Sequence, residues 1–74
     1  MKKFRIKTYN RDFLVDSPDK AADFAFEEVG DWLFAASVRE SCEEMNIGDS
    51  DIWTYVERNT GDDVHMTIEC VEEN

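Results

Sequence analysis

Few side chains in this sequence could carry out catalysis. His65 is the single histidine, and Cys42 and Cys70 are the two cysteines. A nucleophilic mechanism needs a serine or cysteine beside a base that accepts its proton, and no such pairing is evident around His65. A structural zinc needs four ligands, which two cysteines and one histidine cannot supply. We therefore expect no enzyme activity and no cofactor.

Two further kinds of site are disfavoured by spacing. Residues 49–51, Asp-Ser-Asp, bring oxygen ligands together, but the third acid and the glycine of a calcium loop do not follow at the required steps. Gly30, Gly48 and Gly61 are isolated from one another, so the chain has no glycine-rich loop for a phosphate. No metal site is predicted.

Carboxylates are the abundant functional groups. The 74 residues include 18 Asp and Glu against 8 Lys and Arg, a net charge of −10, and five of the basic residues lie among the first eleven. Formal charge bears on partners and solubility rather than on fold. The sequence therefore predicts a negative surface presented to a positive partner. An acidic protein whose charge only maintains solubility is the simpler alternative.

The acids recur at helical spacing. Asp19, Asp23 and Glu27 are four residues apart, which places them on one helix face about 6 Å apart along the axis. Such a row is similar to a nucleic-acid backbone, which carries about one charge per 3.4 Å per strand. It would compete for Lys- and Arg-lined grooves, and its binding would weaken with salt. The predicted partner-binding residues are Asp19, Asp23, Glu27, Glu28, Asp31, Glu40, Glu43 and Glu44.

Hydrophobic patterning predicts the elements that position these acids. Residues 3–9, 52–58 and 64–71 alternate as strands do, and residues 13–15 could form a short return strand. Ser17 and Asp31 are suited to begin two helices, the first ending at Gly30 and the second near Gly48. A single bent helix over 18–46 is the main alternative, because a glycine costs a continuous helix only about 1 kcal/mol.

This order of elements predicts a single domain over residues 1–74. The fold class is α+β, order ββααββ, with two hairpins forming a small antiparallel sheet and two helices packed on one face. If Ile52 and Val56 fill the core, Trp53 and Tyr55 lie together on the open sheet face as a secondary contact patch. The opposite register buries both aromatic side chains.

The remaining features concern the environment of the chain. Cys42 and Cys70 are too few for a disulfide framework, so we expect buried, reduced thiols and a cytoplasmic location. No window approaches 18 apolar residues, so no membrane span is expected.

The basic N-terminal strand raises the question of direct nucleic-acid binding. Lys3, Arg5 and Lys7 share one strand face with Tyr9, an arrangement that can hold phosphate and stack a base. The rest of the chain would repel a polyanion beyond a Debye length of about 8 Å, so we expect no direct contact with nucleic acid. We expect the basic face to pair with acids of the same molecule, or with the acidic helices of a second copy in a homodimer.

In size, acid content and layout, the chain resembles small phage-encoded inhibitors, the anti-CRISPR and anti-restriction proteins that imitate DNA. The resemblance extends over the whole length and includes no diagnostic motif, so it transfers no site residue. It implies an inhibitor in the host cytoplasm that binds the basic nucleic-acid-binding surface of a host defence effector. The alternative is a non-catalytic interaction module or immunity-type adaptor that docks through Trp53 and Tyr55.

Overall fold

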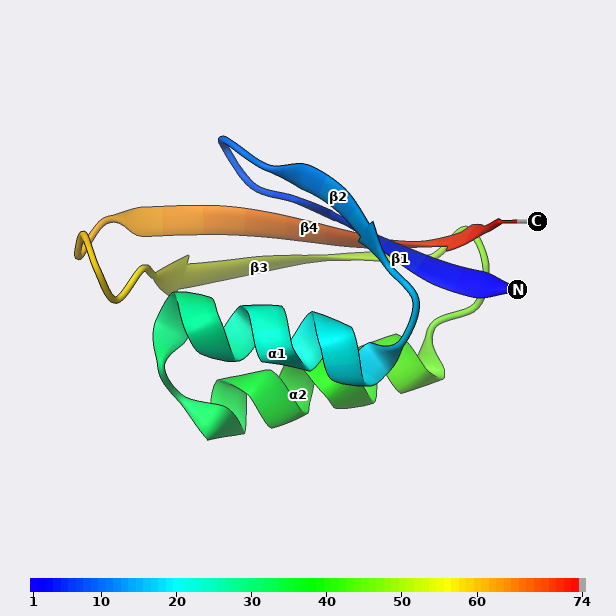
Figure 1. The fold of residues 1–74 in the computed structure, drawn as a ribbon, viewed down its shortest axis with the longest axis horizontal. Coiled ribbons are helices and arrows are strands. Elements are labelled where there is room, and N and C mark those ends of the chain that lie inside the picture. Colours follow the sequence, from blue (N-terminus) through cyan, green and yellow to red (C-terminus); the bar gives the residue numbers. More distant parts are fainter. Residues whose placement is uncertain (74) are drawn as a thin grey trace.

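Four strands and two helices make up the computed structural model, which describes residues 1–73. Along the chain they are β1 (Lys2–Lys7), β2 (Asp12–Val15), α1 (Pro18–Val29), α2 (Trp32–Glu44), β3 (Ser50–Val56) and β4 (Asp63–Glu72). The strands form one antiparallel sheet in the order β2-β1-β4-β3. The predicted α+β class and the order ββααββ are confirmed (Figure 1).

Both helices begin where their capping residues predict, and α1 also ends as predicted, whereas α2 ends at Glu44, before the predicted Gly48. The Ser17 hydroxyl accepts a hydrogen bond from the Lys20 N–H at 3.2 Å, and the Asp31 carboxylate accepts one from the Leu33 N–H at 2.9 Å. Gly30 adopts the left-handed conformation with φ of 78° and ends α1. The alternative of one bent helix is therefore wrong.

The central strands supply much of the core. Side chains of every second residue are buried, Phe4 and Ile6 in β1 and Met66, Ile68 and Cys70 in β4, as expected for a sheet with one buried face. In the register, Phe4 lies opposite Cys70 and Ile6 opposite Ile68. These side chains therefore share one face of the sheet.

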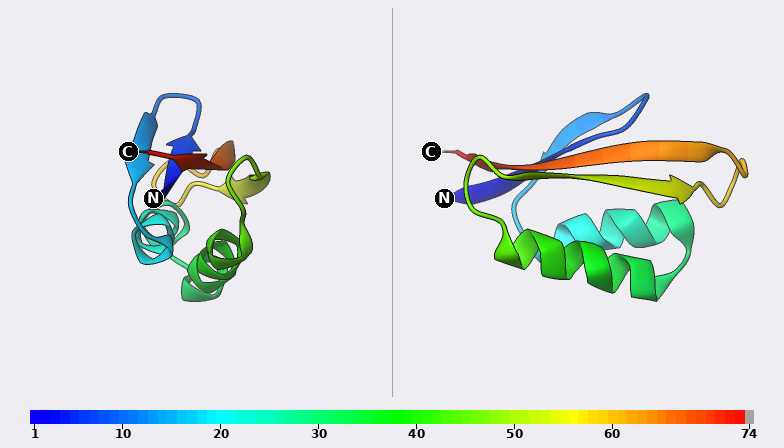
Figure 2. Two further views of the ribbon diagram at one scale, coloured as in Figure 1. Left: turned by 90° about the vertical axis from the view of Figure 1, so that its right-hand side faces the viewer. Right: turned by 180° about the vertical axis from the view of Figure 1, so that it is seen from behind.

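Aromatic rings join the helices to the sheet. The centroids of Phe13 in β2 and Phe24 in α1 are 4.9 Å apart, and Phe34 in α2 lies 5.6 Å from Trp53 and 5.5 Å from Tyr55 in β3. Figures 1 and 2 show α1 and α2 side by side beneath the sheet. The contacts with Phe34 place the side chains of Trp53 and Tyr55 between β3 and α2.

The arrangement with Trp53 and Tyr55 on the open face is wrong. Tyr55 is 7% exposed and Trp53 is partly buried, whereas Ile52 and Val56 are 73% and 54% exposed. Burying two large aromatic side chains removes more apolar surface from water than burying Ile52 and Val56 would. The register therefore places the aromatics inward.

Both cysteines are free and buried, which confirms the prediction of buried thiols. Burial raises the pKa of the Cys42 thiol to about 11. A thiol with a raised pKa is a poor nucleophile near neutral pH. Cys42 and Cys70 therefore serve as small apolar core residues.

Candidate protein-binding surface

Charge is distributed unevenly between the helices and the strands. The four strands contain four basic and five acidic residues, a net charge of −1. The two helices contain two basic and seven acidic residues, a net charge of −5. The loops and termini carry the rest of the total of −10. Negative charge is therefore nearly compensated in the sheet and largely uncompensated in the helices.

The basic residues of β1 explain this compensation. Arg5 donates two hydrogen bonds of 2.8 Å to the two carboxylate oxygens of Asp12, and Lys3 lies 3.8 Å from Glu73. The Arg5–Asp12 pair raises the pKa of the guanidinium and lowers that of the carboxyl. Glu69 lies opposite Arg5 in the register between β1 and β4. Acids of the sheet thus find cations within the same molecule.

Four of the eight predicted binding residues take part in intramolecular contacts. Asp19 and Glu43 both lie 3.8 Å from Arg39, which bridges the two helices. Glu28 accepts a hydrogen bond of 2.8 Å from the Tyr55 hydroxyl. Asp31 caps α2. These contacts give the four carboxylates structural roles that the spacing argument did not include.

The other four predicted residues form what we call the helical acid surface: Asp23, Glu27, Glu40 and Glu44. All four are exposed, and none forms an ion pair within residues 1–73. At 3.6 residues per turn, Asp23 and Glu27 project from α1 opposite the buried Ala21 and Ala25. Glu40 and Glu44 are one turn apart on α2. These acids face solvent, and Asp23 shares a groove with Arg39 without forming an ion pair with it.

A groove between the helices was missed by the sequence interpretation. Its volume is about 190 Å³, and its lining includes Phe26 from α1 and Trp32 from α2, flanked by Asp23 and Arg39. Trp32 is 68% exposed and Phe26 43% exposed. We call it the Trp32 groove. Residue spacing could not reveal this exposure, because Trp32 precedes the buried Ala35 by three residues, which is itself a helical spacing.

Not all acids lie on the helices, because eight of the 18 follow residue 44. Several of these stabilise loops. The buried Glu57 carboxylate accepts hydrogen bonds from the N–H groups of Asn59 and Thr60 at 3.1 and 2.8 Å, which lower its pKa. Asp51 accepts a hydrogen bond from Ser41. By contrast, Asp62 and Asp63 at the β3–β4 turn are exposed and form a second, smaller group of acids.

The polar groups considered for catalysis are dispersed. His65 is exposed on β4, with Nδ1 3.0 Å from the Thr54 hydroxyl oxygen. Over residues 1–73, no group of three or more His, Cys, Asp and Glu side chains is arranged to hold a metal ion. The same part of the chain contains no helix with the length and apolar character needed to cross a membrane.

Comparisons of the chain with protein-family models, with curated proteins and with solved structures gave no match. The site is therefore interpreted from its own residues. Two features of the helical layer stand out, the helical acid surface and the Trp32 groove. Together they provide unpaired negative charge next to exposed apolar side chains.

Proposed function

We propose that this protein is a non-catalytic inhibitor that imitates DNA and binds the basic nucleic-acid-binding surface of another protein. The observation that carries the proposal is the uneven compensation of charge, with −5 on the helices and −1 on the strands. The proposal takes α1 and α2 as one layer over one sheet face. The ring contact between Phe13 and Phe24 and those of Phe34 support that arrangement.

Electrostatics would govern the encounter with the partner. A surface with one sign of charge accelerates association with a surface of opposite sign, and salt weakens this attraction. A Lys- and Arg-lined groove for nucleic acid presents positive charges at the spacing of phosphates. Asp23 and Glu27 on α1, with Glu40 and Glu44 on α2, would take the place of phosphates in such a groove.

The Trp32 groove would add affinity that charge alone does not provide. Tryptophan is enriched among the residues that dominate binding energy at protein interfaces, where it is surrounded by polar groups. Trp32 lies beside Asp23 and Arg39 in this way. The resemblance to phage-encoded inhibitors suggests that the partner is a host defence effector, such as a nuclease that acts on DNA.

The test is displacement of a labelled DNA duplex from purified bacterial defence nucleases, followed by fluorescence anisotropy. The helical variant combines Asp23→Lys, Glu27→Lys and Glu40→Lys. The matched control combines Asp62→Lys, Asp63→Lys and Glu72→Lys, which are exposed acids outside the helices. Each set reverses three charges, so both change the net charge from −10 to −4.

The helical variant should require at least about tenfold more protein for the same displacement, equivalent to about 1.4 kcal/mol of lost binding. The control should resemble the wild type. Equal losses in both variants would mean that total charge acts without a defined surface. The proposal would also be wrong if the wild-type protein displaced DNA from none of the nucleases.

A second candidate function is an interaction module that docks through the Trp32 groove, with charge only accelerating the encounter. The exposure of Trp32 and Phe26 favours it. In that case Trp32→Ala should abolish binding, while the helical charge variant should mainly lower the association rate. Docking through Trp53 and Tyr55 is not retained, because their side chains are occupied in contacts with Phe34.

A further inference from the structure

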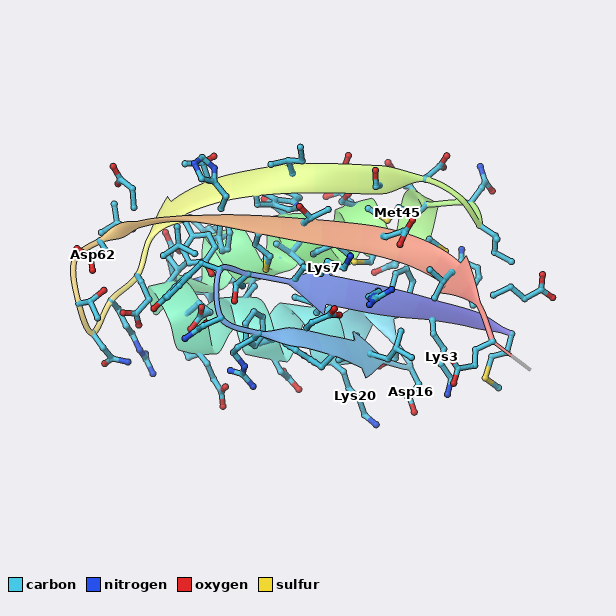
Figure 3. The ribbon with its side chains drawn as sticks, turned by 90° about the horizontal axis from the view of Figure 1, so that it is seen from above. Lys3, Lys7, Asp16, Lys20, Met45 and Asp62 are labelled. Atoms are coloured by element: carbon cyan, nitrogen blue, oxygen red, sulfur yellow. The ribbon has the colours of Figure 1, made fainter. Side chains whose placement is uncertain are left out.

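One edge of the sheet is long and unpaired. In the sheet order β2-β1-β4-β3, both β2 and β3 are edge strands. β2 has only four residues, whereas β3 has seven. In Figure 3 β3 runs along the outer edge of the sheet, on the side away from β2. An unpaired strand edge presents free N–H and C=O groups that can pair with another strand.

The hydrogen bonds at both ends of β3 show which of its residues have free backbone groups. The Cys70 N–H donates to the Asp49 carbonyl at 2.8 Å, and the Glu57 N–H donates to the Asp62 carbonyl at 2.9 Å. In an antiparallel pair, alternate residues point their backbone groups toward the partner strand. Residues 51, 53 and 55 therefore bond to β4, while the N–H and C=O groups of Ile52, Thr54 and Val56 point outward.

The same three residues also have side chains on the open face of the sheet. Ile52 and Val56 are 73% and 54% exposed, and the stretch from Ile52 to Val56 contains no charged residue. Natural edge strands are commonly protected by lysine, proline or a bulge. The stretch contains neither lysine nor proline, and its register with β4 is uninterrupted. The edge is therefore unprotected over residues 52–56, with Asp51 as the single charged residue of β3.

We propose that β3 pairs antiparallel with β3 of a second copy of this chain, around a two-fold axis at Thr54. In this register, residues 52, 54 and 56 of one copy lie opposite residues 56, 54 and 52 of the other. The backbone groups that point outward in one copy therefore meet those that point outward in the other. This register also places Ile52 opposite Val56 of the second copy, and Val56 opposite Ile52 of the second copy. Three pairs with two hydrogen bonds each would give roughly six inter-chain bonds.

Symmetry favours a second copy over an unrelated strand. A two-fold interface is self-complementary, since the same patch serves both subunits. The β3 edge meets this requirement, because Thr54 lies midway between two exposed β-branched apolar residues. Cross-strand pairs of such side chains stabilise a sheet by about 0.2–1 kcal/mol each. The result would be a continuous eight-stranded sheet.

Salt distinguishes this interface from the proposed binding of a basic partner. Each copy has a net charge of −10, so two copies repel each other and added salt should strengthen the dimer. Salt should instead weaken the complex of the helical acid surface with a basic protein. The two proposals can therefore fail independently.

The test is the molar mass of the full chain, measured by sedimentation velocity and light scattering at low and high salt, up to millimolar protein concentration. We expect twice the 8.6 kDa of one chain, with a larger dimer fraction at high salt. Ile52→Lys should raise the dimer dissociation constant at least about tenfold. Thr54→Pro, which removes an outward N–H at an edge position that tolerates proline, should have the same effect.

The matched control is Leu14→Lys, which adds the same charge at an exposed apolar residue of the other edge strand. It should leave the dimer intact. Circular dichroism checks that each variant is folded. A monomeric wild-type protein at high salt, or an Ile52→Lys variant that dimerises as the wild type does, would overturn the proposal. Loss of the dimer in Leu14→Lys alone would place the interface elsewhere and also overturn it.

Discussion

The helices and the sheet of this protein differ in how far their acidic residues are balanced by basic ones. In the sheet, Arg5 and Lys3 pair with acids of neighbouring segments, and the strands approach neutrality. In the helices, Arg39 and Lys20 are the two basic residues against seven acids. An uncompensated row of like charges destabilises its own helix. The difference is that the acids of the sheet are mostly compensated within the molecule, whereas most acids of the helices are not.

The exposed apolar residues of the helices and of β3 also differ in their surroundings. The helices expose Phe26, Trp32 and Leu33, of which Phe26 and Trp32 lie beside Asp23 and Arg39. Those of the β3 edge, Ile52 and Val56, lie in an uncharged stretch. The proposed partner of the first surface has the opposite charge, and the proposed partner of residues 52–56 is a second copy of the chain. The two proposed interfaces should therefore respond to salt in opposite directions.

The largest change in stability is expected from a substitution in the core to which the sheet and the helices both contribute. Ile68 in β4 is fully buried, so Ile68→Ala should lower the free energy of unfolding by about 2–5 kcal/mol. The measurement is urea unfolding at fixed salt and a protein concentration at which the chain is monomeric. Ile52→Ala is the control, because an exposed residue should change stability by no more than about 0.5 kcal/mol. Similar losses in both variants would contradict the assigned faces of the sheet.

A smaller change in stability is expected from the hydrogen bond that joins Tyr55 of β3 to Glu28 of α1. Tyr55→Phe removes the hydroxyl that donates to Glu28, and it should cost about 1 kcal/mol of unfolding free energy. A double-mutant cycle with Glu28→Ala, which removes the acceptor, isolates the coupling of this pair. Measurable coupling would assign Glu28 to the structure rather than to the binding surface. Zero coupling would leave Glu28 available as one of the predicted partner-binding residues.

The smallest effect concerns the charge row itself. Asp23→Lys places a cation between Asp19 and Glu27, so two repulsive pairs become attractive and α1 should gain about 0.5 kcal/mol. The gain is measured by thermal unfolding and should disappear at high salt. Asp63→Lys in β4 changes the net charge equally and should give a smaller gain. A destabilised Asp23→Lys variant would show that the row is already compensated.

Local chemistry made the element order predictable from the sequence. The hydroxyl of Ser17, the left-handed Gly30 and the carboxylate of Asp31 each act within a few residues of their own position, so the sequence alone carries the information. The alternation of β3 was equally clear, but both of its faces contain apolar residues. The choice between Ile52 and Trp53 depends on Phe34, which comes from a different element.

The candidate site was predictable to the same extent. Spacing placed Asp19, Asp23 and Glu27 on one helix face, which follows from the geometry of α1. The ion pair between Asp19 and Arg39 joins two helices, and spacing within one helix cannot reveal it. The Trp32 groove exists only where α1 and α2 meet. Surfaces formed by one element could thus be inferred, whereas those shared by two could not.

Arg58, which follows the end of β3, contacts the connection between α1 and α2 at Glu28 and Gly30. The Arg58 N–H donates to the Glu28 carbonyl at 2.9 Å, and the Arg58 side chain lies 3.1 Å from the position that a Cβ on Gly30 would occupy. A methyl group at Gly30 would therefore meet both a disfavoured backbone conformation and the Arg58 side chain. Amide exchange at this connection and at the exit of β3 should accordingly report a single opening event, so a disturbance at either place would loosen both.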